Sequence, residues 1–189
     1  MRILLLIDDY YPSTKAAPKI MHDLGEQLVR EGHQVIVITP NDSVAESLSV
    51  CVEDGITVVR VRTGRLKYAG RALRGLREFR LSASIWRKAR TFLKSTPCDL
   101  IIFYSPTIFF GDLVHKLKAL WRCPAYLVLR DIFPLWAVNA GIIGKGMLYR
   151  YLHYKELRQY NAADVIGVES SGNLPYFSEE LRRKNYRVE

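Results

Sequence analysis

The chain has 189 residues, of which 49% are hydrophobic and 25% charged, which is the composition of an ordinary soluble domain. This length is close to the upper end for one hydrophobic core and short for two. The three cysteines, Cys51, Cys98 and Cys123, are far apart, which excludes a disulfide framework and favours a reducing compartment. The sequence has no apolar run of about 18 residues, so no transmembrane helix is predicted.

The net charge of +9 is concentrated in one segment. Residues 60–94 contain twelve Lys and Arg and one acid, Glu78, whereas the rest of the chain carries 16 basic and 18 acidic side chains. We therefore expect an anionic partner at this segment: a membrane surface, a polyanion or a nucleic acid.

Apolar runs alternate with helical periodicity from the start of the chain. Residues 3–7 predict a buried strand, residues 10–17 a loop, residues 20–28 a helix with apolar positions four apart, and residues 35–38 a second strand. This order is a βαβ unit, and a wholly apolar first strand implies a parallel sheet covered on both faces.

The same alternation continues to the end of the chain. Further strands are predicted at residues 52–62, with Asp54 and Gly55 as a turn before the alternating part, and at 100–104, 125–129 and 165–168. Further helices are predicted at residues 69–93, 108–121, 147–162 and 173–184. Residues 42–51 are expected to form a surface helix or loop, and residues 186–189 resemble the start of another strand. We therefore predict one doubly wound, Rossmann-like α/β domain with a mostly parallel sheet.

Polar residues follow most of the predicted strands. In doubly wound folds ligands bind at the carboxyl ends of the strands, so these residues are expected along one edge of the sheet. They are Asp8, Asp9, Thr39, Ser105, Arg130, Asp131, Glu169, Ser170 and Ser171.

Several catalytic signatures are missing. The sequence has no G-x-G-x-x-G after the first strand, no G-x-x-x-x-G-K-[ST] and no G-x-S-x-G, and its four histidines form no metal-binding spacing. His33 opens a strand directly after a helix and is expected to be structural. The pair Asp8 and Asp9 suggests a receiver domain, but the third strand ends in Arg60 and Arg62 instead of an acceptor aspartate. Solvated acids at a strand end are the alternative.

Five motifs stand in a characteristic order: LIDDYYP at residues 6–12, MHDL at 21–24, EGHQVIVITP at 31–40, LRDIFP at 129–134 and AADVIGVES at 162–170. Together they resemble the N-terminal half of a GT-B glycosyltransferase of family 4. The segment APKIMHD at residues 17–23 is most similar to transferases that build bacterial O-antigen and capsular polysaccharide, including the L-fucosamine transferase type.

The resemblance implies two Rossmann-like domains that face each other across a cleft. The C-terminal domain would hold the nucleotide-sugar donor, and residues 1–189 would be the single N-terminal, acceptor-side domain, with the C-terminal donor-binding domain absent. The activity implied is that of a retaining hexosyl- or aminohexosyltransferase without a cofactor or metal. We expect this chain to be inactive by itself.

The resemblance places the donor phosphates at the loop formed by Ser13, Thr14, Lys15, Ala16 and Ala17. Relatives often have adjacent glycines there, so that backbone N–H groups approach the diphosphate. In this chain Lys15 could supply a positive charge, and the two small alanines still permit a close approach. The alternative is a polar surface loop.

Asp131 ends the fifth predicted strand, where relatives place a His or Asp near the acceptor and the transferred sugar. Its carboxylate could orient an acceptor hydroxyl or stabilise positive charge at the anomeric carbon, or it could pair with Arg130 or cap the next turn. Arg130 could bind an acceptor phosphate or be an ordinary surface arginine. The remaining cleft residues implied are Ser105, Glu169, Ser170, Ser171 and Asn173. Ser170 or Ser171 could instead cap the last helix.

The resemblance also implies a lipid-linked saccharide acceptor, so we expect a cytoplasmic enzyme peripheral to the inner face of the cell membrane. An apolar stripe flanked by arginines can lie in the membrane interface. The predicted membrane-facing residues are Arg65, Lys67, Arg71, Arg74 and Arg77. A helix packed on the sheet with its basic side in water is the alternative.

Two other classes of function stay open. One is a non-enzymatic α/β binding or signalling module, and the other is a nucleic-acid-binding domain that uses residues 60–94. Few aromatic residues interleave with these arginines and the sequence has no recognised reader motif, so no nucleic-acid partner is expected.

Overall fold

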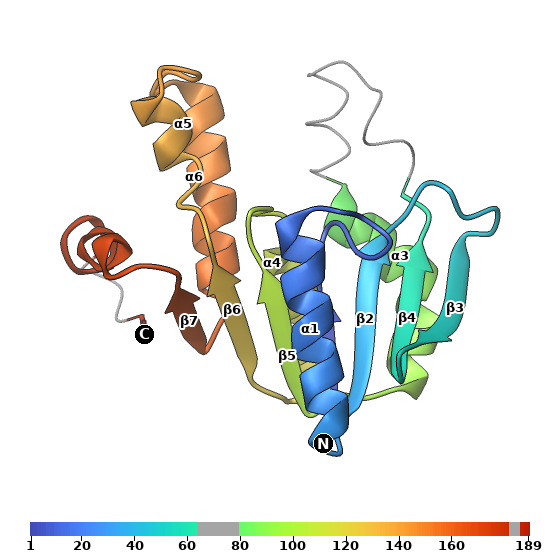
Figure 1. Cartoon of the computed structure of the whole chain (residues 1–189). Coiled ribbons are helices and arrows are strands. Elements are labelled where there is room, and N and C mark those ends of the chain that lie inside the picture. The colour runs from blue at the N-terminus through green and yellow to red at the C-terminus, as the bar shows by residue number, and fades with distance from the viewer. Residues whose placement is uncertain (64–79, 182–185) are drawn as a thin grey trace.

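The computed structural model describes residues 1–63, 80–181 and 186–189. A seven-stranded sheet with the order β3-β4-β2-β1-β5-β6-β7 forms its centre (Figure 1). The strands are β1 (Arg2–Leu6), β2 (Gln34–Pro40), β3 (Leu48–Glu53), β4 (Ile56–Val61), β5 (Leu100–Tyr104), β6 (Ala125–Leu129) and β7 (Val165–Val168). All neighbouring strands are parallel except the antiparallel pair β3 and β4. The prediction of a doubly wound, mostly parallel α/β fold is confirmed.

Helices cover both faces of the sheet. They are α1 (Ala16–Arg30), α3 (Leu81–Ser95), α4 (Gly111–Trp121), α5 (Leu135–Asn139) and α6 (Met147–Tyr160), followed by the 3-10 helix η1 (Ser171–Asn173) and the π-helix η2 (Tyr176–Glu180). In Figure 1, α1 lies in front of the sheet and α3 and α4 lie behind it.

Strand β1 occupies the middle of the sheet because its side chains are apolar on both faces. Leu4 and Leu6 pack into the core beneath α3 and α4, whereas Ile3, Leu5 and Ile7 pack into the core beneath α1. The expectation that this first strand is buried on both faces is therefore confirmed.

The predicted apolar stripe of α1 is wrong in one position. Ile20 is half exposed, whereas Met21 and Gly25 face the sheet. A Cβ on Gly25 would lie 2.8 Å from Cδ1 of Ile56, so the absence of a side chain lets α1 approach β4 closely. The helix ends at Arg30, and Gly32 follows with a φ of +83°, as the sequence indicates.

The edge of the sheet differs from the expected pattern. Residues 42–51 were expected to lack a strand, but β3 begins at Leu48, and the predicted strand 52–62 is divided between β3 and β4. The division arises at Asp54 and Gly55, whose φ values of +50° and +78° turn the chain into an antiparallel hairpin.

The C-terminal part also differs in detail. Helix α5 lies between residues 129 and 147, where the sequence predicts neither a helix nor a strand, and the last predicted helix is replaced by η1 and η2. Val188 forms a parallel bridge with Ile166, in agreement with the predicted start of a strand. The predicted basic helix is confirmed only as α3, because residues 64–79 lie outside the described residues.

Helices α5 and α6 form a hairpin that rises beyond the carboxyl ends of the central strands (Figure 1). Its base is tied to α4, where Gly111 packs against the backbone of Gln159. Within the described ranges, no helix combines the length and the hydrophobicity that crossing a bilayer requires.

Candidate functional site

The carboxyl ends of the parallel strands bring the predicted polar residues to one edge of the sheet, where some of them line two separate pockets. The Asp131 pocket has a volume of about 410 Å³ and lies beyond β6 and β7. The first-loop pocket has a volume of about 940 Å³ and lies beyond β1, β2 and β4. No residue lines both pockets, so the predicted donor loop and acceptor residues occupy neighbouring but distinct hollows.

The carboxylate of Asp131 is exposed at the wall of its pocket. Within the described part of the chain it has no hydrogen-bond or ion-pair partner, and only its backbone carbonyl is engaged, accepting a 3.1 Å hydrogen bond from Phe133. An unpaired carboxylate at a concave surface can accept a hydrogen bond from a ligand hydroxyl without first breaking a bond within the protein.

Arg130 does not pair with Asp131. Its Nε lies 3.6 Å from Oε2 of Glu169, and its Nη1 lies 3.5 Å from the hydroxyl of Tyr104. Arg130 and Glu169 therefore join the ends of β6 and β7, while Asp131 remains available. The guanidinium is partly exposed and lines the pocket, so it can also contact an anionic group there.

The rest of the Asp131 pocket wall is formed by α5 and by the segment after β7. Leu135, Trp136 and Asn139 contribute from α5, and Gly172, Asn173 and Tyr176 from the later segment. Of these residues the family resemblance implied only Asn173. The helix α5 is too short for a periodic signal, and Gly172 and Tyr176 lie beyond the motif at residues 162–170.

A buried polar network supports this wall. Glu156, which has no exposed surface, accepts hydrogen bonds from the hydroxyls of Tyr160 (2.9 Å) and Tyr176 (3.0 Å), and its other oxygen lies 2.7 Å from Nδ1 of His153. Burial raises the pKa of Tyr160 well above its ordinary value of 10, so this hydroxyl remains a donor even in mildly alkaline solution. Sequence analysis missed the network because Glu156 and Tyr176 belong to different elements.

None of the three predicted cleft serines lines the Asp131 pocket. Ser105 is fully buried, and its N–H donates to the carbonyl of Val128 and extends the pairing of β5 with β6, so the prediction that it faces the cleft is wrong. Ser170 accepts a 3.2 Å hydrogen bond from the N–H of Gly172 and so caps the short 3-10 helix η1, whereas the alternative had it or Ser171 capping a last helix over residues 173–184. Ser171 is exposed in η1 but does not line the pocket.

The predicted donor loop already holds an internal ion pair. Nζ of Lys15 lies 2.7 Å from Oδ2 of Asp9, and the hydroxyl of Ser13 donates to the same oxygen at 3.0 Å. Ser13, Thr14 and Lys15 line the first-loop pocket, whose wall also includes Asp8 and Asp42. The first-loop pocket is therefore more negatively charged than the sequence of residues 13–17 alone indicates.

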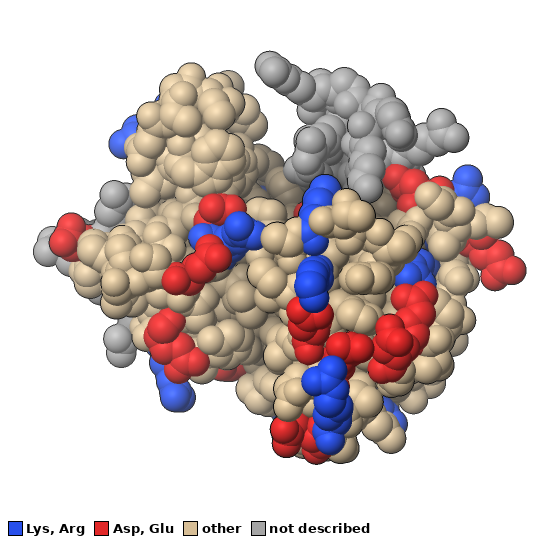
Figure 2. Space-filling view, in the orientation of Figure 1, with Lys and Arg blue, Asp and Glu red and all other residues tan. Residues whose placement is uncertain are grey.

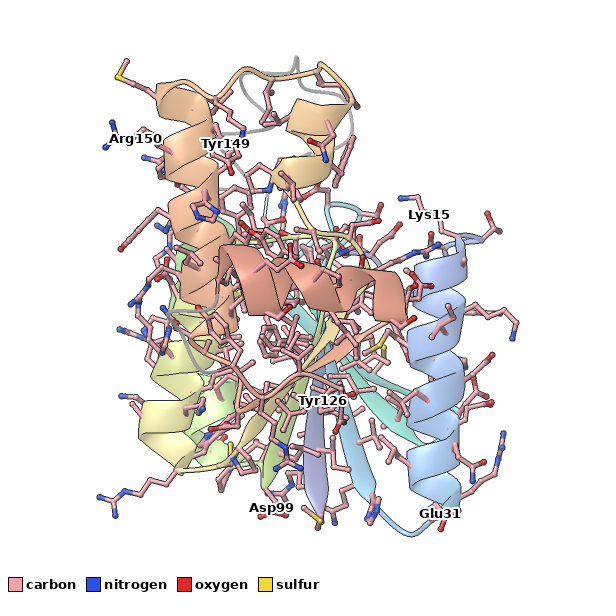
Figure 3. The ribbon with its side chains drawn as sticks, turned by 90° about the vertical axis from the view of Figure 1, so that its left-hand side faces the viewer. Lys15, Glu31, Asp99, Tyr126, Tyr149 and Arg150 are labelled. Carbon is pink, nitrogen blue, oxygen red and sulfur yellow. The ribbon has the colours of Figure 1, made fainter. Side chains whose placement is uncertain are left out.

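The N-terminus of α1 adjoins the same pocket. Lys15 precedes the helix in an extended conformation, and no side chain caps the first turn, which begins with Ala16 and Ala17. Figure 3 shows Lys15 at this end of α1. The small side chains and the free N–H groups of the first turn fit the predicted close approach of a phosphate.

One group of side chains has potential metal ligands close together. Among the described residues, His22, Glu26 and Asp54 place one ligand atom each within 4.8 Å of one another. Each of them has protein partners: Nε2 of His22 lies 3.3 Å from Asp54, Nδ1 of His22 lies 2.8 Å from the hydroxyl of Tyr10, and Glu26 pairs with Arg30. These contacts account for the cluster as a link between α1 and the β3–β4 hairpin.

The five predicted membrane-facing residues, Arg65 to Arg77, lie outside the described residues. Part of the same basic segment is used within the fold. Arg60 pairs with Glu53 at 2.7 Å and donates to the carbonyl of Tyr11, and Arg62 donates to the carbonyl of Ala45. These two arginines therefore stabilise the sheet edge and its loops.

Comparison with known proteins identifies a family and a fold. The family profile described as "Glycosyl transferase 4-like domain" matches residues 17–172. No curated protein matches the sequence. Solved structures that match include sucrose-phosphate synthase from Thermosynechococcus elongatus (TM-score 0.72, 14% identity, covering 100% of this chain and 47% of that one).

Two other matching structures have ligands. The E. coli trehalose-6-phosphate structure bound with UDP-2-fluoro glucose has a TM-score of 0.64 at 13% identity over 100% of this chain and 48% of that one. The catalytic domain of starch synthase IV from Arabidopsis thaliana, bound to ADP and acarbose, has a TM-score of 0.61 at 12% identity over 99% and 50%. The chain thus spans about half the length of these proteins, and it has the fold of one Rossmann-like half of a GT-B glycosyltransferase.

Proposed function

This chain belongs to the glycosyl transferase 4-like domain family, and from that premise we propose that it is the acceptor-binding half of a retaining, nucleotide-sugar-dependent glycosyltransferase. The acceptor we propose is a lipid-linked saccharide used in bacterial surface polysaccharide synthesis, at the inner face of the cell membrane. Family membership supports the enzyme class, and the sequence motifs support the finer assignment.

One observation carries the proposal for the site: the Asp131 carboxylate stands unpaired at the wall of a pocket at the carboxyl end of β6. An acceptor hydroxyl within about 2.6–3.2 Å of this carboxylate would be oriented by donating its hydrogen to it. The same negative charge would stabilise the positive charge that develops at the anomeric carbon during transfer.

Arg130 offers the pocket a second kind of contact with the acceptor. Its guanidinium, held beside Glu169, is positioned to contact an acceptor phosphate while Asp131 contacts a sugar hydroxyl. A saccharide joined to a lipid through a diphosphate carries both groups, so the pair matches that acceptor class.

The donor phosphates are proposed to lie at the first turn of α1, beside Lys15. Because Lys15 pairs with Asp9 in the free protein, phosphate binding requires Lys15 to exchange Asp9 for a phosphate oxygen. Neutralising Asp9 is therefore expected to strengthen phosphate binding, since Lys15 no longer has to leave a carboxylate.

The acceptor assignment can be tested on this chain by NMR. The probe is a short-chain polyprenyl diphosphate that carries one N-acetylhexosamine, titrated into the ¹⁵N-labelled protein. We expect the amide signals of Asp131, Gly172 and Asn173 to shift, and Asp131→Asn to weaken binding at least about fivefold because the carboxylate acceptor is lost. The control is Asp23→Asn, since Asp23 forms an exposed ion pair with Lys19 on the outer side of α1.

Shifts that avoid the Asp131 pocket, or an affinity that Asp131→Asn leaves unchanged, would contradict the assignment. In a protein that also contains a donor-binding half, Asp131→Asn should lower kcat by roughly 10²–10⁴, the usual range for a positioned acid or base.

A further inference from the structure

Exposed apolar side chains gather on the hairpin formed by α5, the connecting loop and the first turns of α6, residues 132–155. Six of the thirteen large hydrophobic side chains that are exposed in the described chain belong to it, and Met147 and Ile142 are 88% and 65% exposed. The others are Trp136, Leu148, Tyr151 and Tyr154. Such a concentration on one projecting element marks a surface that contacts an apolar partner.

The hairpin is also free of acidic residues. Residues 132–155 contain no Asp or Glu and carry Lys145, Arg150 and Lys155. Lys155 is paired with Asp112, whereas Lys145 and Arg150 are exposed. In Figure 2 the hairpin is the lobe at the upper left, which is tan with a blue edge and shows no red. Figure 3 shows Arg150 pointing away from the sheet.

Aromatic residues add a third property. Trp136, Tyr151 and Tyr154 are exposed, and Tyr149 stacks on His153 with nearly parallel rings 5.7 Å apart. Tryptophan and tyrosine have an apolar ring with one polar atom, and they are enriched where proteins meet the headgroup layer of a bilayer. Apolar tips, basic residues and interfacial aromatics together match the chemistry of an anionic lipid surface.

The hairpin and the Asp131 pocket share α5. Leu135, Trp136 and Asn139 line the pocket, and the same short helix leads directly into the apolar loop. Because the hairpin projects beyond the strand ends where the pocket lies, contact with a bilayer would hold the pocket beside the lipid headgroups (Figure 1).

We propose that residues 132–155 dock on an anionic bilayer surface, with Ile142, Met147 and Leu148 in the headgroup layer and Lys145 and Arg150 against lipid phosphates. The proposal depends on the proposed function in one respect, the identity of the acceptor. Docking would bring a membrane-bound acceptor close to Asp131. Vesicle binding itself requires no saccharide.

The first test is co-sedimentation of this chain with phosphatidylcholine vesicles, with and without phosphatidylglycerol, over a salt series. We expect binding to the anionic vesicles that weakens with salt. Lys145→Gln combined with Arg150→Gln should lower the affinity about 25-fold, since each basic residue near an anionic surface contributes about fivefold. Replacing Ile142, Met147 and Leu148 by serine should lower it at least about tenfold.

Val50→Ser with Val52→Ser is the matched control, because these side chains are exposed and apolar but lie on the edge strand β3. This control should bind like the original protein, and urea unfolding should show that all variants are folded. A polarity-sensitive dye on Met147→Cys, in a Cys51→Ser background, should shift to shorter wavelength with anionic vesicles, and the same dye on Val52→Cys should not.

Three results would overturn the docking face: no binding to anionic vesicles at low salt, binding that the serine variant leaves unchanged, or a concentration-dependent dimer that the serine variant abolishes in place of vesicle binding. Vesicle binding as expected, together with a failed saccharide titration, would leave the docking face intact and reject the proposed acceptor.

Discussion

The hydroxyl of Tyr176 donates a 3.0 Å hydrogen bond to Oε1 of Glu156, a carboxylate with no exposed surface. Tyr160 donates to the same oxygen at 2.9 Å. Tyr176 lines the Asp131 pocket, and this hydrogen bond ties it to α6, which forms one arm of the projecting hairpin.

Glu156→Ala should destabilise the fold by about 3 kcal/mol or more, because it leaves two buried hydroxyls without an acceptor. Tyr176→Phe removes one of these bonds together with its donor and should cost about 1 kcal/mol. Urea unfolding followed by circular dichroism measures both. A loss below about 1 kcal/mol for Glu156→Ala would contradict the assigned role of this carboxylate.

The ion pair of Glu53 with Arg60 should make stability depend on pH. The hydrogen bond from Arg60 holds the pKa of Glu53 below its ordinary value of about 4.5, and burial only partly opposes this. A folded-state pKa below the unfolded one stabilises the fold above pH 4.5, and that contribution is lost as pH falls through the depressed value.

Urea unfolding between about pH 3 and pH 7 should therefore show that Glu53→Gln is less stable than the original protein at neutral pH and that the difference disappears in acid. Because the pair is partly exposed, we expect a difference of no more than about 1 kcal/mol. Glu46→Gln, at an exposed position, is the control. An equal difference at both ends of the range would rule out this linkage.

Gly111 should not tolerate a side chain. A Cβ there would lie 2.8 Å from the backbone N and Cα of Gln159, so α4 and α6 would have to separate. Gly111→Ala should cost about 1–3 kcal/mol in thermal or urea unfolding. Gly144→Ala is the control, because a Cβ there meets no atom within 4 Å. Similar stability of the two variants would mean that the helices can move apart freely.

The buried serines Ser82 and Ser105 should respond in opposite ways to alanine. Ser82 donates to the carbonyl of Phe109 and accepts a 3.2 Å hydrogen bond from Leu113, so Ser82→Ala should cost about 1–3 kcal/mol. The hydroxyl of Ser105 has no partner among the described residues, so Ser105→Ala should be neutral or slightly stabilising. Chemical unfolding of both variants compares them directly, and a clear loss for Ser105→Ala would reveal a hidden partner.

The sequence was sufficient to predict the central strands, because a run such as residues 3–7 is apolar at every position and can be buried only inside a covered sheet. The same pattern placed Asp131 and Lys15 at the carboxyl edge, as the structure confirms. It could not show that Lys15 pairs with Asp9, since that contact depends on how the loop folds back on the strand end.

Other features have no local signal in the sequence. Helix α5 has five residues, too few for a 3.6-residue period to be recognised. The network of Glu156 joins side chains of α6 and η2, and only the tertiary fold brings these elements together. Ser105 was assigned to the cleft because it follows a strand, but the pairing of β5 with β6 continues through its N–H and buries it.

The central position of β1 has a consequence for synthesis on the ribosome. Ile3 pairs with Val35 on one side, soon after it is made, but its partner on the other side is Leu100. Synthesis proceeds at roughly 5–20 residues per second, so the edge of β1 that later pairs with β5 stays unpaired for about 5–20 s. An apolar strand with an open edge is a template for wrong pairing. The nascent protein is therefore most exposed to aggregation along the strand that ends up most deeply enclosed.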